Sequence, residues 1–179
     1  QCLSALLDVI EDYRWKRGQS TGKHVPELVV TSYDLKSAFD SVQEFTIRAS
    51  CERLNLPSSF IDYVLATLSG ATSTVRCRDG QTAPIDLLSG VRQGCPLSAL
   101  LFIIVMDPLH AGMPDVSDGY QMASGPTLHS LGFSDDTATV SSTWEGTCRQ
   151  HQWVREFFAA NHLRLNASKS ACVIGSGLD

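Results

Sequence analysis

Two adjacent aspartates, Asp135 and Asp136, stand between two short apolar, β-prone runs in the segment Leu131–Thr137. Side chains alternate between the two faces of a strand. A pair in mid-strand would therefore turn one carboxylate into the core, where an unpaired charge is very costly. A tight β-turn at a sheet edge avoids this cost, so the pair predicts a hairpin turn. Such a turn suits a hard cation such as Mg²⁺, although an isolated Asp-Asp pair is more typical of an ordinary polar turn.

A second acidic site lies in Tyr33–Asp40, where an apolar run passes into a helical pattern. One interpretation is structural: Asp34 ends a strand and Asp40 caps the following helix. The other is functional, with Asp34 joining Asp135 and Asp136 in a set of three carboxylates. Two Mg²⁺ ions about 3.5–4 Å apart need such shared oxygen ligands to promote an in-line phosphoryl displacement. We favour function for Asp34 and leave both interpretations open for Asp40.

A third segment, Gly90–Ser98, combines unusual backbone freedom with hydrogen-bonding capacity. Gly90 and Gly94 allow unusual dihedral angles and the close approach of another backbone. Gln93 offers donors and acceptors, and Pro96 suits the first turn of a helix. Taken alone, the segment is also typical of a plain helix entry that contains glycine.

Length and composition limit the function classes. With 179 residues, 43% of them hydrophobic, the chain is one domain or a sizeable piece of a larger protein. Its net charge of -5 counts against a self-sufficient nucleic-acid-binding protein, which usually carries a basic stripe. A catalytic core whose basic surfaces lie elsewhere stays possible. Because the chain opens without methionine in a helix-like run, we expect an internal fragment.

We expect neither secretion nor a membrane span. No charged-then-apolar leader opens the chain. The longest apolar run, Leu97–Met106, is about half of what a bilayer requires and is interpreted as a buried helix. Among the cysteines, only Cys148 has a histidine, His151, at a ligand-like spacing, and no second pair completes a zinc site. We therefore expect buried, reduced thiols at Cys2, Cys51, Cys77, Cys95, Cys148 and Cys172.

The apolar periodicity predicts helices interspersed with antiparallel hairpins, which indicates an α+β fold. In the first helix, one face carries Leu3, Leu6, Leu7, Ile10 and Tyr13. Asp79-Gly80 is a strong hairpin signal, and Ser58 is the expected cap of its helix. Helices are expected at residues 2–17, 41–54, 58–68, 97–109 and 144–162, and strands at 28–35, 72–78, 83–88, 120–123, 128–133, 137–142 and 171–174.

In this order and spacing, the segments resemble the palm of a reverse transcriptase. Asp34–Asp40 is similar to motif A, Gly90–Phe102 to motif B, Phe133–Asp136 to motif C and Leu163–Lys169 to motif D. The strings AFDSV, RQGCPLS and LRLNxxK are most similar to LINE-type (non-LTR) retrotransposon enzymes, with group II intron enzymes as the alternative. The resemblance covers residues 28–175.

The resemblance implies an α+β polymerase palm, with helices packed on one face of an antiparallel sheet. Residues 1–27 would end the fingers or form a linker helix, and residues 28–179 would form the palm, without a thumb. The implied reaction transfers a deoxynucleotide to a primer 3′-hydroxyl. The implied partners are an RNA template, a DNA primer or target, and a deoxynucleoside triphosphate. The implied location is the nucleus or a cytoplasmic ribonucleoprotein, and the resemblance gives no oligomeric state.

The resemblance also assigns the metal ligands. Asp34 and Asp135 correspond to the two metal-bridging carboxylates, and Asp136 to a supporting acid. The backbone carbonyl of Leu35 would be a further ligand. The implied cofactor is a pair of Mg²⁺ ions, with Mn²⁺ as a possible replacement.

Four more residues receive substrate roles in the same way. Phe39 is similar to the steric gate that excludes a ribonucleotide 2′-hydroxyl; the alternative is a core aromatic. Gln93 resembles the residue that lines the nucleotide pocket and contacts the primer–template, and Gly94 adjoins it. Lys169 is similar to a lysine that protonates the leaving pyrophosphate; the alternative is a solvated surface lysine.

The chain departs from the family pattern at two positions. Ser134 stands where the family commonly has Ala or Met, and Ala99 where it usually has Pro. Neither change touches a carboxylate, and we expect the turn and the helix to form. A decayed or domesticated copy, kept for its fold or for RNA binding, is the competing hypothesis. An unrelated metal-dependent phosphodiesterase ranks last, because it gives no reason for the second and fourth motifs. We expect an isolated palm to be poorly soluble and nearly inactive.

Overall fold

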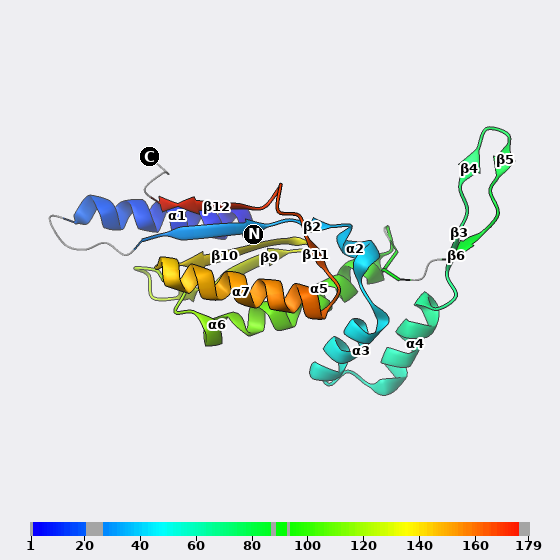
Figure 1. Ribbon diagram of the computed structural model, residues 1–179. Coiled ribbons are helices and arrows are strands. Elements are labelled where there is room, and N and C mark those ends of the chain that lie inside the picture. Colours follow the sequence, from blue (N-terminus) through cyan, green and yellow to red (C-terminus); the bar gives the residue numbers. More distant parts are fainter. Residues whose placement is uncertain (1, 21–26, 87–88, 93, 176–179) are drawn as a thin grey trace.

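A four-stranded antiparallel sheet forms the centre of the molecule (Figure 1). The computed structural model describes residues 2–20, 27–86, 89–92 and 94–175. Neighbouring strands follow the order β12-β1-β10-β9. Their bounds are Val29–Tyr33 (β1), Ser130–Phe133 (β9), Asp136–Ser141 (β10) and Ala171–Ile174 (β12). The sheet and its helices confirm the predicted α+β class.

Strand β1 is paired on both sides. Its register aligns Tyr33 with Thr137 of β10 and Ser32 with Ala171 of β12. The β-prone sequence of this strand places Val29 and Tyr33 on one face, where each is only 1% exposed. The burial of these two side chains fixes the register, because a slip by one residue would turn both to the other face.

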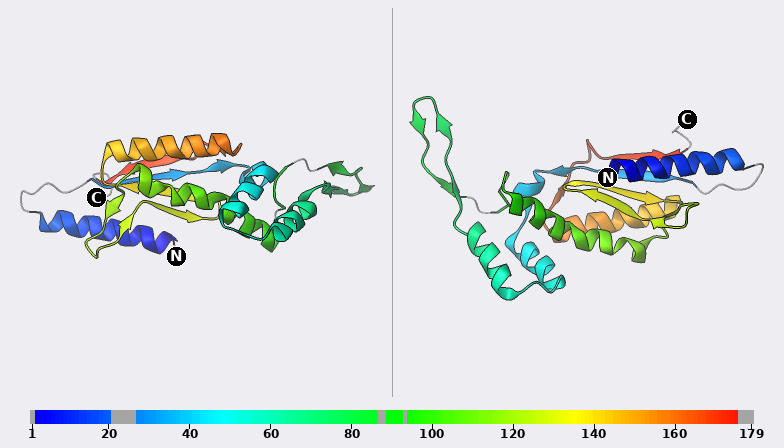
Figure 2. Two further views of the ribbon diagram at one scale, coloured as in Figure 1. Left: turned by 90° about the horizontal axis from the view of Figure 1, so that it is seen from below. Right: turned by 180° about the vertical axis from the view of Figure 1, so that it is seen from behind.

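Two long helices cover one face of the sheet, with a short helix between them in the sequence (Figures 1 and 2). Helix α7 contacts β1 and β10, and α5 contacts β9. The hydroxyl of Thr143 accepts a hydrogen bond from the amide of Gly146 at 3.0 Å and caps α7, while Pro96 occupies the first turn of α5. The bounds are Pro96–Ala111 (α5), Met113–Val116 (α6) and Trp144–Ala160 (α7).

The stretch Pro96–Val116 is, in the part of the chain that the structure describes, the one helical stretch long and apolar enough to cross a membrane. The core helix of a globular domain has the same composition. Phe102, Val105 and Leu109 are fully buried in a cluster that also contains residues of α7. The predicted buried helix is thus confirmed, and it extends to Ala111.

Helix α1 (Cys2–Gln19) packs on the opposite face of the sheet (Figure 2). Val9 and Tyr13 are buried there with Val140. The expectation that helices cover one face only is therefore wrong. The predicted apolar stripe of this helix is also partly wrong, because Leu3 is 71% exposed and Leu7 50% exposed.

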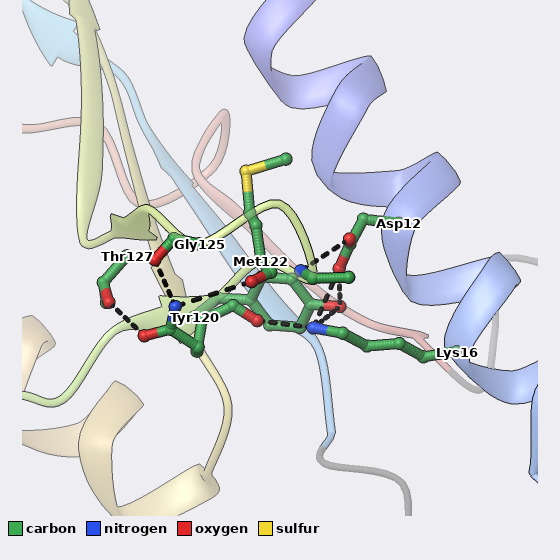
Figure 3. Close-up of polar contacts among 8 residues, drawn as sticks. Asp12, Lys16, Tyr120, Met122, Gly125 and Thr127 are labelled. Atoms are coloured by element: carbon green, nitrogen blue, oxygen red, sulfur yellow. Dashed lines mark hydrogen bonds and ion pairs between the residues drawn. The ribbon is translucent and has the colours of Figure 1, made fainter.

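A polar network fastens α1 to the hairpin of β7 (Tyr120–Gln121) and β8 (Thr127–Leu128) (Figure 3). The carboxylate of Asp12 accepts hydrogen bonds from the Tyr120 hydroxyl at 2.9 Å and from the Ala123 amide at 2.8 Å. It also forms an ion pair with Lys16 at 2.9 Å. Burial raises the pKa of Asp12, but the hydrogen bonds from Lys16, Ala123 and Tyr120 outweigh burial and leave this pKa below its usual value. Burial and the bond to Asp12 raise the pKa of Tyr120.

Three helices and a projecting hairpin lie between β1 and α5 in the sequence. The helices are α2 (Ala38–Ser41), α3 (Glu44–Arg53) and α4 (Ser58–Leu68). The hairpin is a narrow arm that stands away from the sheet (Figure 1), with every side chain from Thr72 to Asp86 exposed. Its strands are β3 (Thr72–Ser73), β4 (Arg76–Cys77), β5 (Gly80–Gln81) and β6 (Ile85–Asp86). A further small pair joins β2 (Leu35–Lys36) to β11 (Arg164–Leu165).

Several local predictions need correction. The helix predicted from residue 41 is two helices, α2 and α3, and Asp40 lies inside α2 instead of capping it. Pro57, not Ser58, precedes the first turn of α4, with no side-chain cap. The turn of the arm is Arg78-Asp79, because Cys77 pairs with Gly80. Of the five cysteines with described side chains, only Cys51 is buried; the exposed ones are Cys77, Cys95, Cys148 and Cys172.

Candidate active site

The predicted carboxylates gather at one end of the sheet. Asp34 directly follows β1, and Asp136 is the first residue of β10. Because Tyr33 aligns with Thr137, the next positions in the same antiparallel register are Asp34 and Asp136. The fold therefore brings the first and third segments together at adjacent strand ends, although about a hundred residues separate them in the sequence.

The predicted hairpin turn is confirmed, with one difference. Phe133 pairs with Asp136, so the loop consists of Ser134 and Asp135, while Asp136 already belongs to β10. Ser134 has a φ of 56°, in the left-handed region that residues other than glycine seldom adopt. Strained backbone of this kind concentrates at functional sites. Asp135 is half-buried in this turn, whereas Asp136 is exposed.

Asp34 is held by the turn that follows β11. The side-chain amide of Asn166 donates to Oδ2 of Asp34 at 2.7 Å, and the backbone amide of Asn166 donates to the Asp34 carbonyl at 2.8 Å. The backbone amide of Asp34 donates to the Ser170 hydroxyl at 3.1 Å. The fourth predicted segment is thereby in direct contact with the first.

The second predicted segment crosses the first at very short range. The amide of Val91 donates to the carbonyl of Phe39, and that of Gly90 to the carbonyl of Val42, each at 2.8 Å. A Cβ atom on Gly90 would lie 2.7 Å from the Cα of Asp40 and 2.9 Å from the Phe39 carbonyl oxygen. Gly90 also has a φ of 93°. Glycine is required here for both space and backbone conformation.

The predicted substrate residues have different surroundings. Phe39 is half-buried and stacks on Phe102 of α5, with ring centroids 5.0 Å apart. This contact agrees with the role of a core aromatic. The role of Phe39 as a steric gate stays a prediction. Gly94 has a φ of 86° and open space where a Cβ would stand. Gln93 lies outside the described residues, so its role stays a prediction.

Lys169 is exposed in the turn that holds Asp34, and its backbone amide donates to the Asn166 carbonyl at 3.1 Å. Neither Asn166 nor Ser170 was predicted to take part in the site. An Asn followed by Ser at the second and fourth positions is typical of a turn held by side-chain hydrogen bonds. That local signal could have predicted the turn but not its contact with Asp34.

The donor chemistry at this end of the sheet fits magnesium. In the described parts of the chain, no three His, Cys, Asp or Glu side chains converge into a preformed metal cage. Magnesium seldom uses such a cage, since it is usually bound by one or two carboxylates together with water and substrate phosphates. Asp34 and the turn of Asp135 and Asp136 supply such carboxylates. The Leu35 carbonyl, in β2 beside them, stays a predicted ligand.

Cys148 and His151 do not form a second metal site. They line a cavity of about 400 Å³ between α7 and the sheet, together with Cys172. Within the described residues, this group does not meet the geometry of a metal cluster. His151 instead stacks on Tyr33, with ring centroids 5.8 Å apart, and burial lowers its pKa.

Sequence comparison relates the chain to retrotransposon polyproteins. It is 30% identical over 145 residues to the Pol polyprotein of a type-1 retrotransposable element R2 from Popillia japonica, covering 80% of this chain and 20% of that protein. It is 29% identical over 147 residues to the polyprotein of the element R2DM from Drosophila melanogaster, covering 82% and 14%. The chain thus spans a fifth or less of the length of these two relatives.

Solved structures share the fold. An apo telomerase from Candida tropicalis matches with a TM-score of 0.71 and 16% identity, over 97% of this chain and 35% of that one. A telomerase from Candida albicans, in complex with an RNA fragment, matches with a TM-score of 0.66 and 15% identity, over 95% and 30%.

A family model settles the membership. The model described as reverse transcriptase (RNA-dependent DNA polymerase) matches residues 7–176, nearly the whole chain. Together with the R2 relatives, it confirms the resemblance to enzymes of non-LTR retrotransposons. This chain belongs to the reverse transcriptase family.

Proposed function

We propose that this chain is the palm of an RNA-directed DNA polymerase of a non-LTR retrotransposon. Residues 28–179 would form the palm, and residues 1–27 would end the fingers or link to them. The observation that carries the proposal is the position of Asp34 and the Asp135-Asp136 hairpin at adjacent strand ends, in a chain of this family. The reaction is attack of a primer 3′-hydroxyl on the α-phosphate of a deoxynucleoside triphosphate, with release of pyrophosphate.

The carboxylates hold the cofactor in this proposal. Asp34 and Asp135 bind two Mg²⁺ ions, or Mn²⁺ in their place, with the Leu35 carbonyl as a further ligand. When bound, these ions lower the pKa of the primer hydroxyl and neutralise charge on the leaving pyrophosphate. Asp136 is exposed at the start of β10 and supports its neighbour, so its loss should be less severe.

The remaining residues select and position the substrate. Phe39, held by its stack on Phe102, closes the space that a ribonucleotide 2′-hydroxyl would need. The Gln93-Gly94 segment lines the nucleotide pocket. Lys169, exposed beside Asp34, donates a proton to the leaving pyrophosphate.

The template partner in this proposal is RNA. The Candida albicans telomerase that shares the fold is in complex with an RNA fragment, and the family is defined by RNA-dependent synthesis. The chain itself carries a net charge of -5. Most phosphate contacts to the RNA template and the DNA primer should therefore come from parts of the protein outside this chain.

Primer extension by the full-length protein on an RNA template tests the proposal. Mutation of a residue that supports a metal ligand typically lowers metal affinity or activity about 10- to 100-fold. Asp34→Asn and Asp135→Asn, which change the proposed ligands themselves, should each lower the rate of primer extension by at least about 100-fold. Asp136→Asn should lose less. Asp115→Asn, at an exposed aspartate of α6, is the matched control and should retain wild-type synthesis.

Two outcomes would contradict the proposal. Undiminished synthesis by Asp135→Asn would reject the assignment of the metal ligands. A wild-type protein that binds RNA but never extends a primer would favour a non-catalytic module.

A further inference from the structure

The turn Asn166–Ser170 grips Asp34 from two sides. It receives one hydrogen bond from the backbone amide of Asp34 and gives one to the Asp34 carbonyl, so the main chain of Asp34 is tied in both directions. A third bond, from the Asn166 side chain, reaches the carboxylate itself at 2.7 Å. Asp34 follows the last residue of β1, beyond the backbone hydrogen bonds of the main sheet. The turn Asn166–Ser170 holds Asp34 there instead.

The amide of Asn166 has a defined orientation. Its Oδ1 accepts a hydrogen bond from the Ser168 hydroxyl at 2.8 Å, which directs Nδ2 toward Asp34. A carboxylate only accepts hydrogen bonds, so it requires the donor end of the amide. A hydrogen bond to an ionised group is also about twice as strong as one between neutral groups. The chain of contacts therefore runs from Ser168 through Asn166 to Oδ2 of Asp34.

We propose that Asn166 is a positioning residue for the polymerase reaction: it fixes the rotamer of the Asp34 carboxylate and keeps it ready to bind a divalent cation. This inference rests on the proposed function. With Oδ2 held by Asn166, the carboxylate presents Oδ1 and the remaining lone pair of Oδ2 in one orientation. A carboxylate without this hydrogen bond would lose rotamer entropy when it binds the cation. Because the hydrogen bond already fixes the rotamer, that entropy cost is not part of cation binding.

The same turn links the metal ligand to the proposed acid. The carbonyl of Asn166 accepts hydrogen bonds from the amides of Lys169 and Ser170, at 3.1 and 3.0 Å, and from the Ser170 hydroxyl at 2.9 Å. The backbone of Lys169 is thus fixed relative to Asn166, which in turn holds Asp34. Asn166 sets the spacing between the residue that binds metal and the residue that donates the proton.

Asn161 provides a matched control. Its side-chain amide donates to the Phe157 carbonyl at 2.8 Å at the end of α7, and it is half-buried like Asn166. Asn161→Ala removes the side-chain hydrogen bond of a half-buried Asn to a backbone carbonyl, and Asn166→Ala removes two side-chain hydrogen bonds, the one to Asp34 and the one from Ser168. Only Asn166 contacts a proposed metal ligand, so a purely structural role predicts similar behaviour for the two variants.

The experiment measures binding of Mn²⁺ to the full-length protein with primer and template, by electron paramagnetic resonance of the free ion. We expect Asn166→Ala to raise the dissociation constant for Mn²⁺ about 10-fold or more, as for other residues that support metal ligands. Ser168→Ala should raise it by a smaller factor. Asn161→Ala should leave it unchanged. The Mg²⁺ concentration that gives half-maximal primer extension should rise in the same order.

Each result decides a different question. Wild-type Mn²⁺ affinity in Asn166→Ala, with normal synthesis by the unaltered protein, would overturn the inference alone. If Asn166→Ala fails to fold, unchanged Mn²⁺ affinity in Ser168→Ala overturns it. Unchanged Mn²⁺ binding and synthesis in Asp34→Asn would instead overturn the proposed metal site.

Discussion

Gly90 is the position at which a single methyl group should disturb the candidate site most. It lies where the segment before α5 crosses α2, with its amide bonded to the Val42 carbonyl at 2.8 Å. We predict that Gly90→Ala destabilises the protein and displaces the backbone of Phe39 and Asp40. Synthesis should therefore fall, and discrimination against ribonucleotides should weaken if Phe39 is the steric gate.

Two separate costs set the magnitude. The φ of Gly90 is 93°, and an L-residue in the left-handed region costs about 1–2 kcal/mol. The new Cβ would also lie 2.7 Å from the Cα of Asp40, which is a backbone atom that cannot rotate away. Overpacking of this kind costs about 1–3 kcal/mol. The expected loss is therefore about 2–5 kcal/mol.

Gly70 separates the two costs. It has a φ of 67° at the end of α4, with open space where a Cβ would stand. Gly70→Ala should lose about 1–2 kcal/mol, from backbone conformation alone. Urea unfolding followed by tryptophan fluorescence measures both variants. Equal losses for Gly70→Ala and Gly90→Ala would refute the close backbone crossing.

Three further predictions concern stability and reactivity. Since hydrogen bonds hold the pKa of Asp12 below its usual value, the contribution of Asp12 to the free energy of unfolding should be complete above about pH 4 and be lost as the pH falls through that lower pKa. Asp12→Asn should lower the free energy of unfolding by about 2 kcal/mol at pH 7. In urea unfolding, the stability of this variant should also depend less on pH in the acid range. The amides of Leu97 and Ser98 lower the pKa of Cys95, so iodoacetamide should alkylate it faster than the exposed Cys77, as read by mass spectrometry; equal rates would contradict this. Thr46 is 2% exposed and its hydroxyl has no hydrogen-bond partner among the described residues. Thr46→Val should therefore stabilise the protein by about 1 kcal/mol, as measured by thermal unfolding. A loss of stability would show that the hydroxyl does have a hydrogen-bond partner.

Elements that depend on local signals could be predicted from the sequence. The hairpin around Asp135 is defined by two apolar runs and a polar turn, and β12 agrees with its predicted bounds. Helix α1 shows where periodicity fails. The helix exists, but the sheet and the β7–β8 hairpin cover Val9 and Tyr13 while Leu3 stays exposed. Periodicity identifies a helix without saying which neighbour will bury it.

Contacts between distant residues were out of reach for the same reason. Asn166 and Asp34 are 132 positions apart in the sequence. The residues around each of them give no signal that the two are in contact. The glycine at position 90 indicated close backbone approach, but not that Asp40 would be the partner. Residue types therefore predict which groups could take part in the candidate site, and only the fold shows which groups hold them in place.

The register of β1 connects the stability of the core to the geometry of the candidate site. Tyr33 is buried on the face that α7 covers, and it aligns with Thr137 on one side. On the other side, Ser32 aligns with Ala171, so the turn Asn166–Ser170 ends at the level of the Asp135-Asp136 hairpin. A slip of β1 by one residue would expose Tyr33 and, in the same step, separate Asp34 from both turns. Burial of Tyr33 in the core thus disfavours a slip of β1 that would keep the strands but separate the residues of the candidate site.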